Sequence, residues 1–153
     1  MQTYRTVVRP EWIDYNEHLR DAFYFLIFSY ATDALMARIG LDEVGRGATG
    51  HTLFTLEAHI NYLAQATLGD PLDVRTQFID RDRKRLHIVH NLHHGASGQL
   101  LAVSEQMLMN INFHTSKACG FAASVEQRLE ALVPRHSGAN HPGYCGRVIA
   151  IRR

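Results

Sequence analysis

Residues 18–39 read HLRDAFYFLIFSYATDALMARI, with no Gly or Pro before Gly40. Phe25 and Phe28 widen an apolar stripe that otherwise follows the helical period at Leu19, Ala22, Phe23, Leu26, Ile27, Tyr30, Ala34 and Leu35. The pattern predicts one long helix from about His18 to Ile39, ended by Gly40 as helices commonly end. A helix that is apolar on nearly every side is expected to be covered by other structure.

The apolar period changes from 3.6 to 2 after the Gly-rich segment 40–50, which we predict to be a flexible loop. Phe54–Tyr62 alternates strictly, so its apolar residues are expected on one face of a strand: Phe54, Leu56, Ala58, Ile60 and Tyr62. Runs of β-forming residues bounded by turn residues predict further strands at Thr3–Val8, Leu72–Ile79, Leu86–His93 and Leu100–Phe113.

These elements predict an α+β fold in which an antiparallel sheet covers a single helix. The expected order is one strand, the long helix, and then four strands joined as a meander. A short helix is expected at Val125–Leu132, and Arg147–Ile151 is a candidate strand in a tail that otherwise carries no clear signal. With 153 residues, the chain is expected to be one domain, residues 1–153, with a core at about residues 3–133.

Composition and charge exclude several classes of protein. The net charge is +1 with His neutral, so no strong field favours nucleic acid or a membrane surface. No apolar run approaches the roughly 20 residues that span a bilayer, and the N-terminal residues lack the apolar block of a signal peptide. Cys119 and Cys145 are far apart in sequence, which favours two free thiols in a reducing, cytoplasmic location.

The loop before the helix reads WIDYNEHLRD over residues 12–21. It resembles the 4-hydroxybenzoyl-CoA thioesterase-like family of hotdog proteins, whose signature is an Asp, a Gly three residues later and often a His. Asp14 and His18 match this signature, Tyr24 matches an aromatic position of the family, and Glu17 stands where the family usually has Gly. The resemblance runs from Thr3 to about Phe113. It implies a hotdog fold, in which an antiparallel sheet wraps around one long central helix.

The resemblance also implies an acyl-CoA thioesterase with no cofactor, since CoA is part of the substrate. Asp14 would be the nucleophile or general base, and the backbone N–H of Asp21 would polarise the thioester carbonyl. A helix start suits this role because its first N–H groups are unpaired and partly positive. Glu57 is a reserve candidate for the base. The alternative reading is that Asp14 only caps the helix.

Several side chains around Asp14 are candidates for binding the acyl group: Trp12, Tyr15, Glu17, His18, Tyr24 and His59. Aromatic faces beside the Glu17 carboxylate would suit a quaternary ammonium group, although the aromatics could equally be core or dimer packing and Glu17 solvated. The basic run Arg83-Lys84-Arg85 resembles the position where relatives hold the CoA phosphates. A solvated turn is the alternative for this run.

Two other patterns favour less specific interpretations. Residues 45–50 spell G-x-G-x-x-G, but they follow a helix and precede a strand, the reverse of a dinucleotide fingerprint. His87, His90, His93 and His94 have no Cys or carboxylate at ligand spacing, so we expect surface or interface histidines and no metal site. His90 should point away from His87 and His93.

Two further functions stay open beside thioester hydrolysis. A hotdog hydratase or dehydratase would pair an Asp with a His five residues on, whereas Asp14 and His18 are four apart. A non-catalytic acyl-CoA-binding hotdog protein would use Asp14 only as a cap. Within the family, the loop and the segment LFTLEAHINY (residues 53–62) resemble the thioesterases linked with bacterial carnitine degradation, which implies betainyl-CoA as substrate. The resemblance also implies a homodimer, or a tetramer built from dimers.

Overall fold

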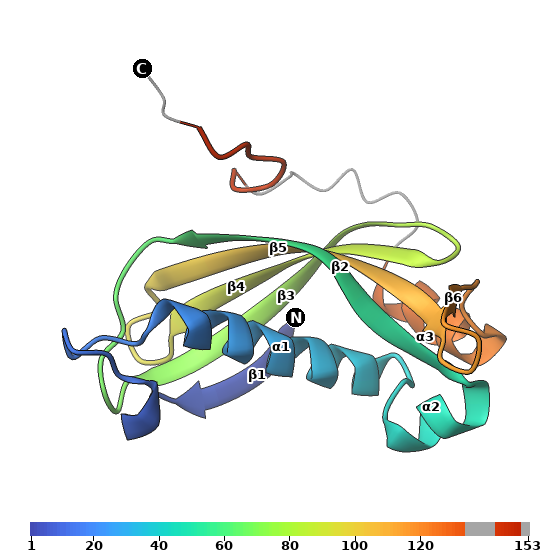
Figure 1. Cartoon of the computed structure of the whole chain (residues 1–153), viewed down its shortest axis with the longest axis horizontal. Coiled ribbons are helices and arrows are strands. Elements are labelled where there is room, and N and C mark those ends of the chain that lie inside the picture. Colours follow the sequence, from blue (N-terminus) through green and yellow to red (C-terminus); the bar gives the residue numbers. More distant parts are fainter. Residues whose placement is uncertain (134–142, 151–153) are drawn as a thin grey trace.

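The computed structural model describes residues 1–133 and 143–150. One antiparallel sheet runs in the order β1-β3-β4-β5-β2, and the short β6 pairs with β5 (Figure 1). The strands are β1 (Gln2–Val7), β2 (His51–Tyr62), β3 (Pro71–Arg81), β4 (Arg85–His94), β5 (Leu100–Asn112) and β6 (Lys117–Ala118). The helices are the 3₁₀ turn η1 (Pro10–Trp12), α1 (Asp21–Arg38), α2 (Glu43–Thr49) and α3 (Ala123–Leu132).

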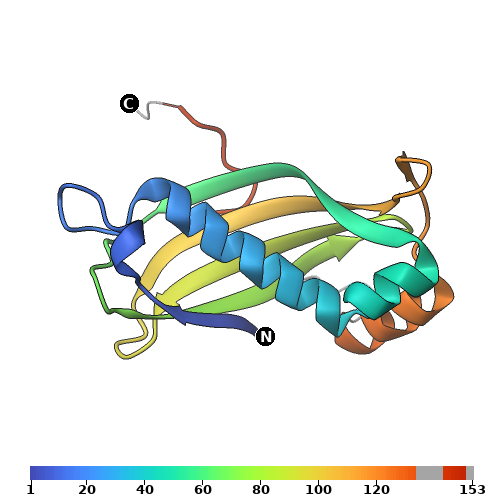
Figure 2. The same cartoon turned by 60° about the horizontal axis from the view of Figure 1, so that its bottom comes forward.

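The sheet curls around α1, which lies across its concave face, while α2 and α3 gather near the end of α1 (Figure 2). This confirms the predicted α+β hotdog architecture. The face of α1 that is turned to the sheet is buried through Tyr24, Ile27, Phe28, Ala31, Thr32, Leu35 and Met36. Phe25 and Tyr30 remain 43% and 38% exposed. The chain therefore covers only part of the apolar surface of its helix.

The predicted meander is wrong for one strand. β3, β4 and β5 are joined consecutively, but β2 pairs with β5 and so lies at the far edge of the sheet from β1. The crossing is made by residues 63–70, where the N–H groups of Leu63 and Ala64 donate to the Leu101 carbonyl. Because of this crossing, β2 has a partner on one side only among the described residues.

The predicted single apolar face of β2 is also wrong. A register shift between Thr55 and Glu57 marks a β-bulge at Leu56, and a bulge reverses which residues face which side. Phe54 lies opposite Met109, whereas Ala58 lies opposite the buried Gln106. Phe54 and Leu56 are consequently half-exposed along the free edge of the sheet.

The start of the long helix and the segment that follows it differ from the prediction, whereas its end at Arg38, with Ile39 as C-cap, agrees with it. α1 begins at Asp21, three residues later than expected, because His18 and Leu19 form isolated β-bridges with Thr67 and Ile13. The predicted loop at 40–50 contains α2, which the Asp42 side chain caps by accepting the N–H of Gly45 at 2.8 Å. A Cβ at Gly45 would lie 2.0 Å from the carbonyl oxygen of Gly40, so only Gly permits this close turn.

A row of buried polar side chains divides the interior into two apolar clusters. Neighbouring members are 2.8–3.2 Å apart and are hydrogen-bonded in the order Thr3, Thr76, His90, Thr32, Gln106 and Ser104. His90 is fully buried and its ring stacks on Phe28 at 5.9 Å. As predicted, His90 points away from His87 and His93, but it is a core residue and the prediction of a surface or interface histidine is wrong for it.

The last described elements pack on both sides of the sheet. α3 is held to β3 by the ion pair between Arg81 and Glu126, at 2.5 Å. Tyr144 and Cys145 pack against a small outer-face cluster that contains Val89 and Val103. Residues 147–150 form no strand, contrary to the prediction, and Ile151 lies outside the described residues. Among the described residues, no single helix is both long and apolar enough to cross a membrane; only α1 and α2 together, bent by 61°, have that length and composition.

Candidate active site

The loop that carries Asp14 is a short, tightly closed hairpin. The N–H of Asp14 donates to the carbonyl of His18 at 2.9 Å, and the N–H of Glu17 donates to the carbonyl of Asp14 at 3.1 Å. One carboxylate oxygen of Asp14 accepts the N–H groups of Asn16 and His18 at 2.8 and 3.2 Å. These bonds occupy Oδ1 and fix the carboxylate, so its direction is set by the loop backbone.

Asp14 does not cap the following helix. The N-cap residue of α1 is Arg20, which makes no capping hydrogen bond with its side chain. The Asp21 carboxylate accepts the N–H of Ala22 at 2.8 Å. The N–H of Asp21 itself has no acceptor among the described residues, as expected for the first residue of a helix. The start of α1 therefore offers a free N–H donor, and the capping interpretation of Asp14 is wrong.

Glu17 keeps the turn that a Gly would form. Its φ is 64°, in the left-handed region that side chains other than Gly rarely adopt. Its side chain is exposed. The departure from the family signature therefore preserves the backbone of the loop and adds a negative charge beside Asp14.

Substitutions at Glu17 test this conformation. Glu17→Val should lower the free energy of unfolding by about 1–3 kcal/mol, because a β-branched residue is strained at positive φ. Glu17→Gly should change it by less than about 1 kcal/mol, since relief of strain opposes the larger freedom of the unfolded chain. Tyr15→Val, in the same loop at an ordinary φ, is the matched control. Equal losses for the two Val variants in chemical denaturation would contradict the assignment.

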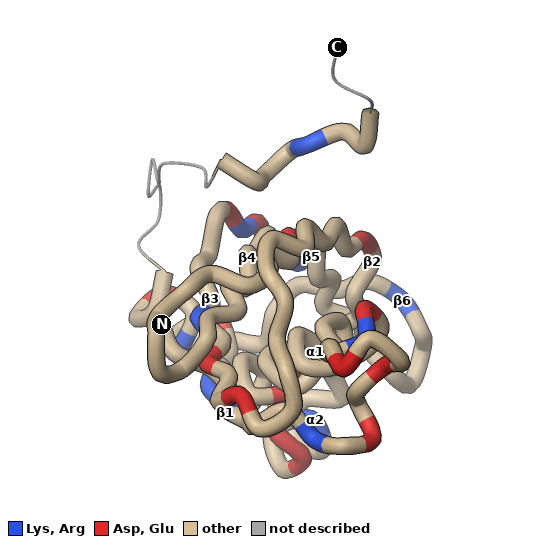
Figure 3. Tube along the Cα trace, turned by 90° about the vertical axis from the view of Figure 1, so that its left-hand side faces the viewer, with Lys and Arg blue, Asp and Glu red and all other residues tan. Residues whose placement is uncertain are grey.

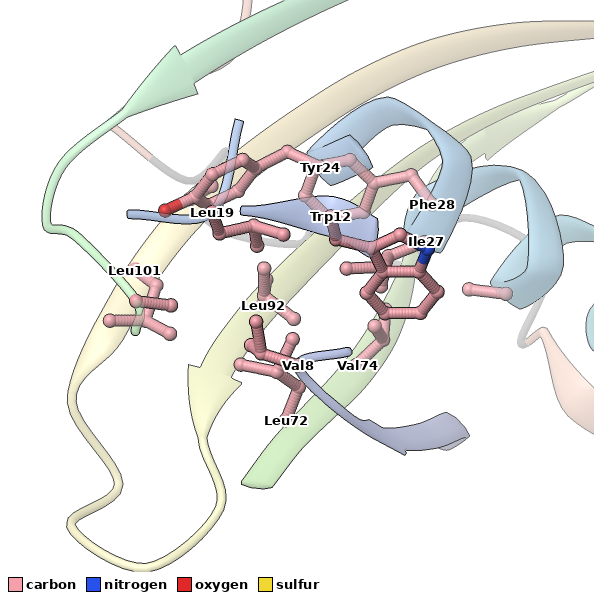
Figure 4. Close-up of a cluster of buried hydrophobic side chains, with 13 residues drawn as sticks. Val8, Trp12, Leu19, Tyr24, Ile27, Phe28, Leu72, Val74, Leu92 and Leu101 are labelled. Atoms are coloured by element: carbon pink, nitrogen blue, oxygen red, sulfur yellow. The ribbon is translucent and has the colours of Figure 1, made fainter. Parts of the chain in front are cut away.

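The aromatic candidates around Asp14 have different environments. The Trp12 ring is 3% exposed, stacks on Phe23 at 5.8 Å and has the Arg9 guanidinium 5.0 Å from its centre. Tyr24 is also buried, and Figure 4 shows both rings within the same cluster of core side chains. Tyr15 is 91% exposed. Trp12 and Tyr24 therefore belong to the core beneath the Asp14 loop, whereas Tyr15 and Glu17 are exposed to solvent.

Tyr24 adds one polar contact at this end of the molecule. Its hydroxyl donates to the Ala64 carbonyl at 3.3 Å, and burial raises the pKa of Tyr24.

Figure 3 looks at this end of the molecule, where acidic positions lie beside the start of α1. Among residues 1–133 and 143–150 no group of three or more His, Cys, Asp or Glu residues is placed to hold a metal ion.

The two candidates on β2 are separated from the Asp14 loop. Glu57 lines a groove of about 460 Å³ between α1 and β2, together with Phe25, Ser29, Thr32, Met36 and Thr55. His59 lies opposite Glu105 on the adjacent strand. Glu105 in turn contacts His87 at 2.7 Å. Glu57 is thus in a position to meet a ligand in this groove, and His59 belongs to a cluster on the outer face of the sheet.

The basic run forms the β3–β4 turn, at the opposite end of the sheet from the start of α1 (Figure 1). Arg85 is held by two hydrogen bonds to the Asp82 carboxylate, at 2.8 and 2.5 Å, and the exposed Arg83 has no ion-pair partner among the described residues. The carbonyl of Arg83 accepts the N–H of Phe121, just before α3. Within one chain the structure does not bring the predicted phosphate-binding residues near Asp14.

Sequence reasoning missed Tyr62, the residue that contacts the start of α1 from β2. Its hydroxyl donates to the Asp21 carbonyl at 3.3 Å, and its ring meets Tyr24 edge-on at 5.3 Å. The strand alternation assigns Tyr62 to the apolar face of a strand, but it is 53% exposed. The sequence carries no local signal of this contact, because the contact depends on the path of β2 along α1.

Comparisons with known proteins agree with this fold. The family model described as "Thioesterase-like superfamily" matches residues 8–129. The chain is 53% identical to a protein of Pseudomonas aeruginosa named betainyl-CoA thioesterase, over 99% of this chain and 95% of that one. It is 33% identical to a Rhizobium meliloti protein named L-carnitine dehydrogenase/betainyl-CoA thioesterase, of which it covers 30%.

Solved structures show the same similarity. A Staphylococcus aureus protein in complex with CoA has a TM-score of 0.90 and 33% identity, over 99% of this chain and 96% of that one. A Pseudomonas putida protein has a TM-score of 0.85 and 51% identity, over 100% and 97% of the two chains. These findings confirm the prediction of a hydrolase that acts on CoA thioesters. The chain belongs to the thioesterase-like superfamily.

Proposed function

We propose that this protein hydrolyses betainyl-CoA to glycine betaine and CoA, with Asp14 as nucleophile or general base. The observation that carries the proposal is the Asp14 loop, in which two backbone N–H groups fix the carboxylate seven residues before the free N–H of Asp21. The named substrate is supported by the 53% identity to a betainyl-CoA thioesterase. The cytoplasmic location stays a prediction; both cysteines are free thiols in the structure.

The geometry suits the reaction because hydrolysis needs a base or nucleophile and a donor for the developing oxyanion. Water adds across the carbonyl–sulfur bond: its oxygen ends in the acid, directly or after attack by the Asp14 carboxylate, and the thiolate of CoA leaves and takes up a proton. The N–H of Asp21 stabilises the oxyanion, aided by the partial positive charge of about half a unit at a helix start. No step needs a metal or a cofactor.

We further propose that two chains form a dimer through the free edge of β2. An unpaired strand edge is a ready template for another strand. Along this edge Phe54 and Leu56 are half-exposed, as is Phe25 across the groove on α1. Antiparallel pairing of two β2 strands about a two-fold axis would join the two sheets and cover these side chains.

The same two-fold axis explains why the basic turn lies far from Asp14 in one chain. β2 has 12 residues, and a strand of that length spans about 40 Å. In the proposed dimer the two β2 strands run in opposite directions, so one end of the first sheet lies beside the other end of the second sheet. The β3–β4 turn of one chain would then approach the Asp14 loop of the other, so each site would use residues of both chains.

Light scattering tests the oligomeric state. The expected mass is two or four times the 17.3 kDa of one chain. The measurement should be made at the concentration used for activity, since a dimer dissociates on dilution. A mass of one chain together with full activity would refute the shared site.

Removal of the basic turn tests its role in binding CoA. Arg83→Ala with Lys84→Ala should raise KM for acyl-CoA much more than it lowers kcat, because lost phosphate contacts weaken ground and transition states alike. Arg5→Ala with Arg38→Ala removes the same charge from exposed positions elsewhere and is the matched control. Thioesters without the nucleotide should respond to neither change. If the basic-turn variant impairs both kinds of thioester equally, the turn is structural.

Release of free thiol from a panel of short, aromatic and quaternary-ammonium acyl-CoAs tests the proposed function. We expect turnover of betainyl-CoA with the highest kcat/KM of the panel. Thiol release also separates hydrolysis from hydration or simple binding, since neither of these frees CoA. Hydrolysis of other acyl-CoAs without betainyl-CoA would keep the reaction and reject the substrate.

A further inference from the structure

Tyr62 places a half-exposed aromatic ring beside the start of α1. Its hydroxyl donates to the Asp21 carbonyl at 3.3 Å, a contact across 41 residues of sequence. Tyr24 meets the ring edge-on, with an interplanar angle of 89° and 5.3 Å between ring centres. One part of the Tyr62 ring is therefore fixed by protein contacts, while 53% of the residue remains open to solvent.

The Asp21 carboxylate lies in the same neighbourhood. It is anchored by the N–H of Ala22 at 2.8 Å, and the residue is exposed. The Tyr62 hydroxyl contacts the backbone of this same residue, and burial, and next the negative charge of Asp21, raise the pKa of Tyr62. An aromatic face with a carboxylate beside it is a typical environment for a cation that cannot donate a hydrogen bond.

We propose that the Tyr62 ring and the Asp21 carboxylate form the subsite for the quaternary ammonium of the acyl group. This inference rests on the proposed hydrolysis of betainyl-CoA and assigns residues to the recognition of its acyl end. It also makes Tyr62, in place of Trp12, the principal aromatic contact of the ammonium group. The Trp12 ring is buried and already has the Arg9 guanidinium over its face.

The dimensions of the substrate support this position. Two single bonds separate the carbonyl carbon from the ammonium nitrogen of a betainyl group, so the two atoms are only about 2.5 Å apart. With the carbonyl oxygen on the N–H of Asp21, the ammonium must lie close to the first residue of α1. Tyr62 reaches the carbonyl of that same residue, whereas Asp33 is 12 residues, or about 18 Å, further along the helix.

The charge at this point also requires a counterion. A helix start carries about half a positive charge, which stabilises the oxyanion but repels an ammonium group. The Asp21 carboxylate contributes a full negative charge and outweighs this repulsion. An uncharged acyl group of the same shape gains nothing from the carboxylate, so the subsite should discriminate by charge.

The discriminating quantity is the ratio of kcat/KM for betainyl-CoA to that for 3,3-dimethylbutanoyl-CoA, in which carbon replaces the ammonium nitrogen. The ratio should exceed one in the wild type. Tyr62→Leu should lower it by about three- to thirtyfold, the range of a single cation–π contact, and Asp21→Asn should lower it in the same direction. Tyr62→Phe should keep the ratio within about threefold because it retains the ring. Tyr30→Leu, a half-exposed tyrosine of α1 that packs on Tyr4, should leave it unchanged.

Two outcomes overturn the subsite. Equal losses for both substrates in Tyr62→Leu, shared by Tyr62→Phe, would mean that Tyr62 only anchors α1 through its hydroxyl. A wild-type ratio that neither Tyr62→Leu nor Asp21→Asn changes would place the cation elsewhere. If neither thioester is hydrolysed, the proposed function fails, and the ratio of calorimetric Kd values for the same two ligands in the same variants still decides the subsite.

Discussion

Asp14→Asn is expected to lower kcat at least about a hundredfold, the usual scale for loss of a general base or nucleophile. The fold of the loop should survive, because the amide oxygen of Asn can accept the same N–H groups of Asn16 and His18 that the carboxylate accepts now. The loss should therefore reflect chemistry and not unfolding. Thiol release from betainyl-CoA and the thermal unfolding midpoint, measured on the same preparation, separate these two causes.

Glu43→Gln is the matched control for this experiment. It also replaces a carboxylate by its amide, at an exposed position of α2 that belongs neither to the Asp14 loop nor to the groove between α1 and β2. Its kcat should stay within about twofold of wild type, as for most surface substitutions. Near-normal turnover by a folded Asp14→Asn protein would reject Asp14 as the catalytic carboxylate and would move attention to Glu57→Gln.

The second large effect is a loss of stability in acid that we expect from His90. Burial lowers the pKa of His90 from 6.5 to about 3, and the ring is held by Thr32 and Thr76. Between these two pH values the unfolded chain binds a proton at His90 that the folded chain does not bind. Stability should therefore fall as the pH falls below 6.5, by about 2 kcal/mol at pH 5, and the loss should level off near pH 3.

Chemical denaturation at pH 7 and pH 5, at one protein concentration, isolates this contribution. His90→Gln should be less stable than wild type at pH 7, because it breaks the buried row of hydrogen bonds, and its disadvantage should shrink by about 2 kcal/mol at pH 5. His59→Gln makes the same replacement at a partly exposed position of β2 and is the control for its general cost in stability. A constant difference between wild type and His90→Gln at both pH values would show that His90 is not held neutral.

The central helix and the β3–β5 part of the sheet are predictable because their signals are local. Periodic apolar residues, turn residues and the strand lengths all lie within short windows. The position of β2 is not local, since it depends on where residues 63–70 cross the molecule. α2 was missed because two Gly residues lower helix propensity, whereas Gly45 is required there by its close approach to Gly40.

In the candidate site, too, the local features are predictable from the sequence and the long-range contacts are not. The Asp14 loop is predictable because its motif occupies a few adjacent residues. The positive φ of Glu17 was not predicted, because a Glu in place of the expected Gly is equally compatible with a different turn. The contact between Tyr62 and Asp21 spans 41 residues and depends on the path of β2 along α1. In the proposed dimer, the relation between the Asp14 loop and the basic turn depends on a second chain, which one sequence does not position.

The central claim is that this protein hydrolyses the thioester of betainyl-CoA, and mass spectrometry of the products in ¹⁸O-labelled water tests it most directly. Under many turnovers, the account predicts equal amounts of free CoA and glycine betaine, with water oxygen in the betaine carboxylate. No labelled betaine above the uncatalysed rate, with the protein folded and betainyl-CoA saturating, would contradict it.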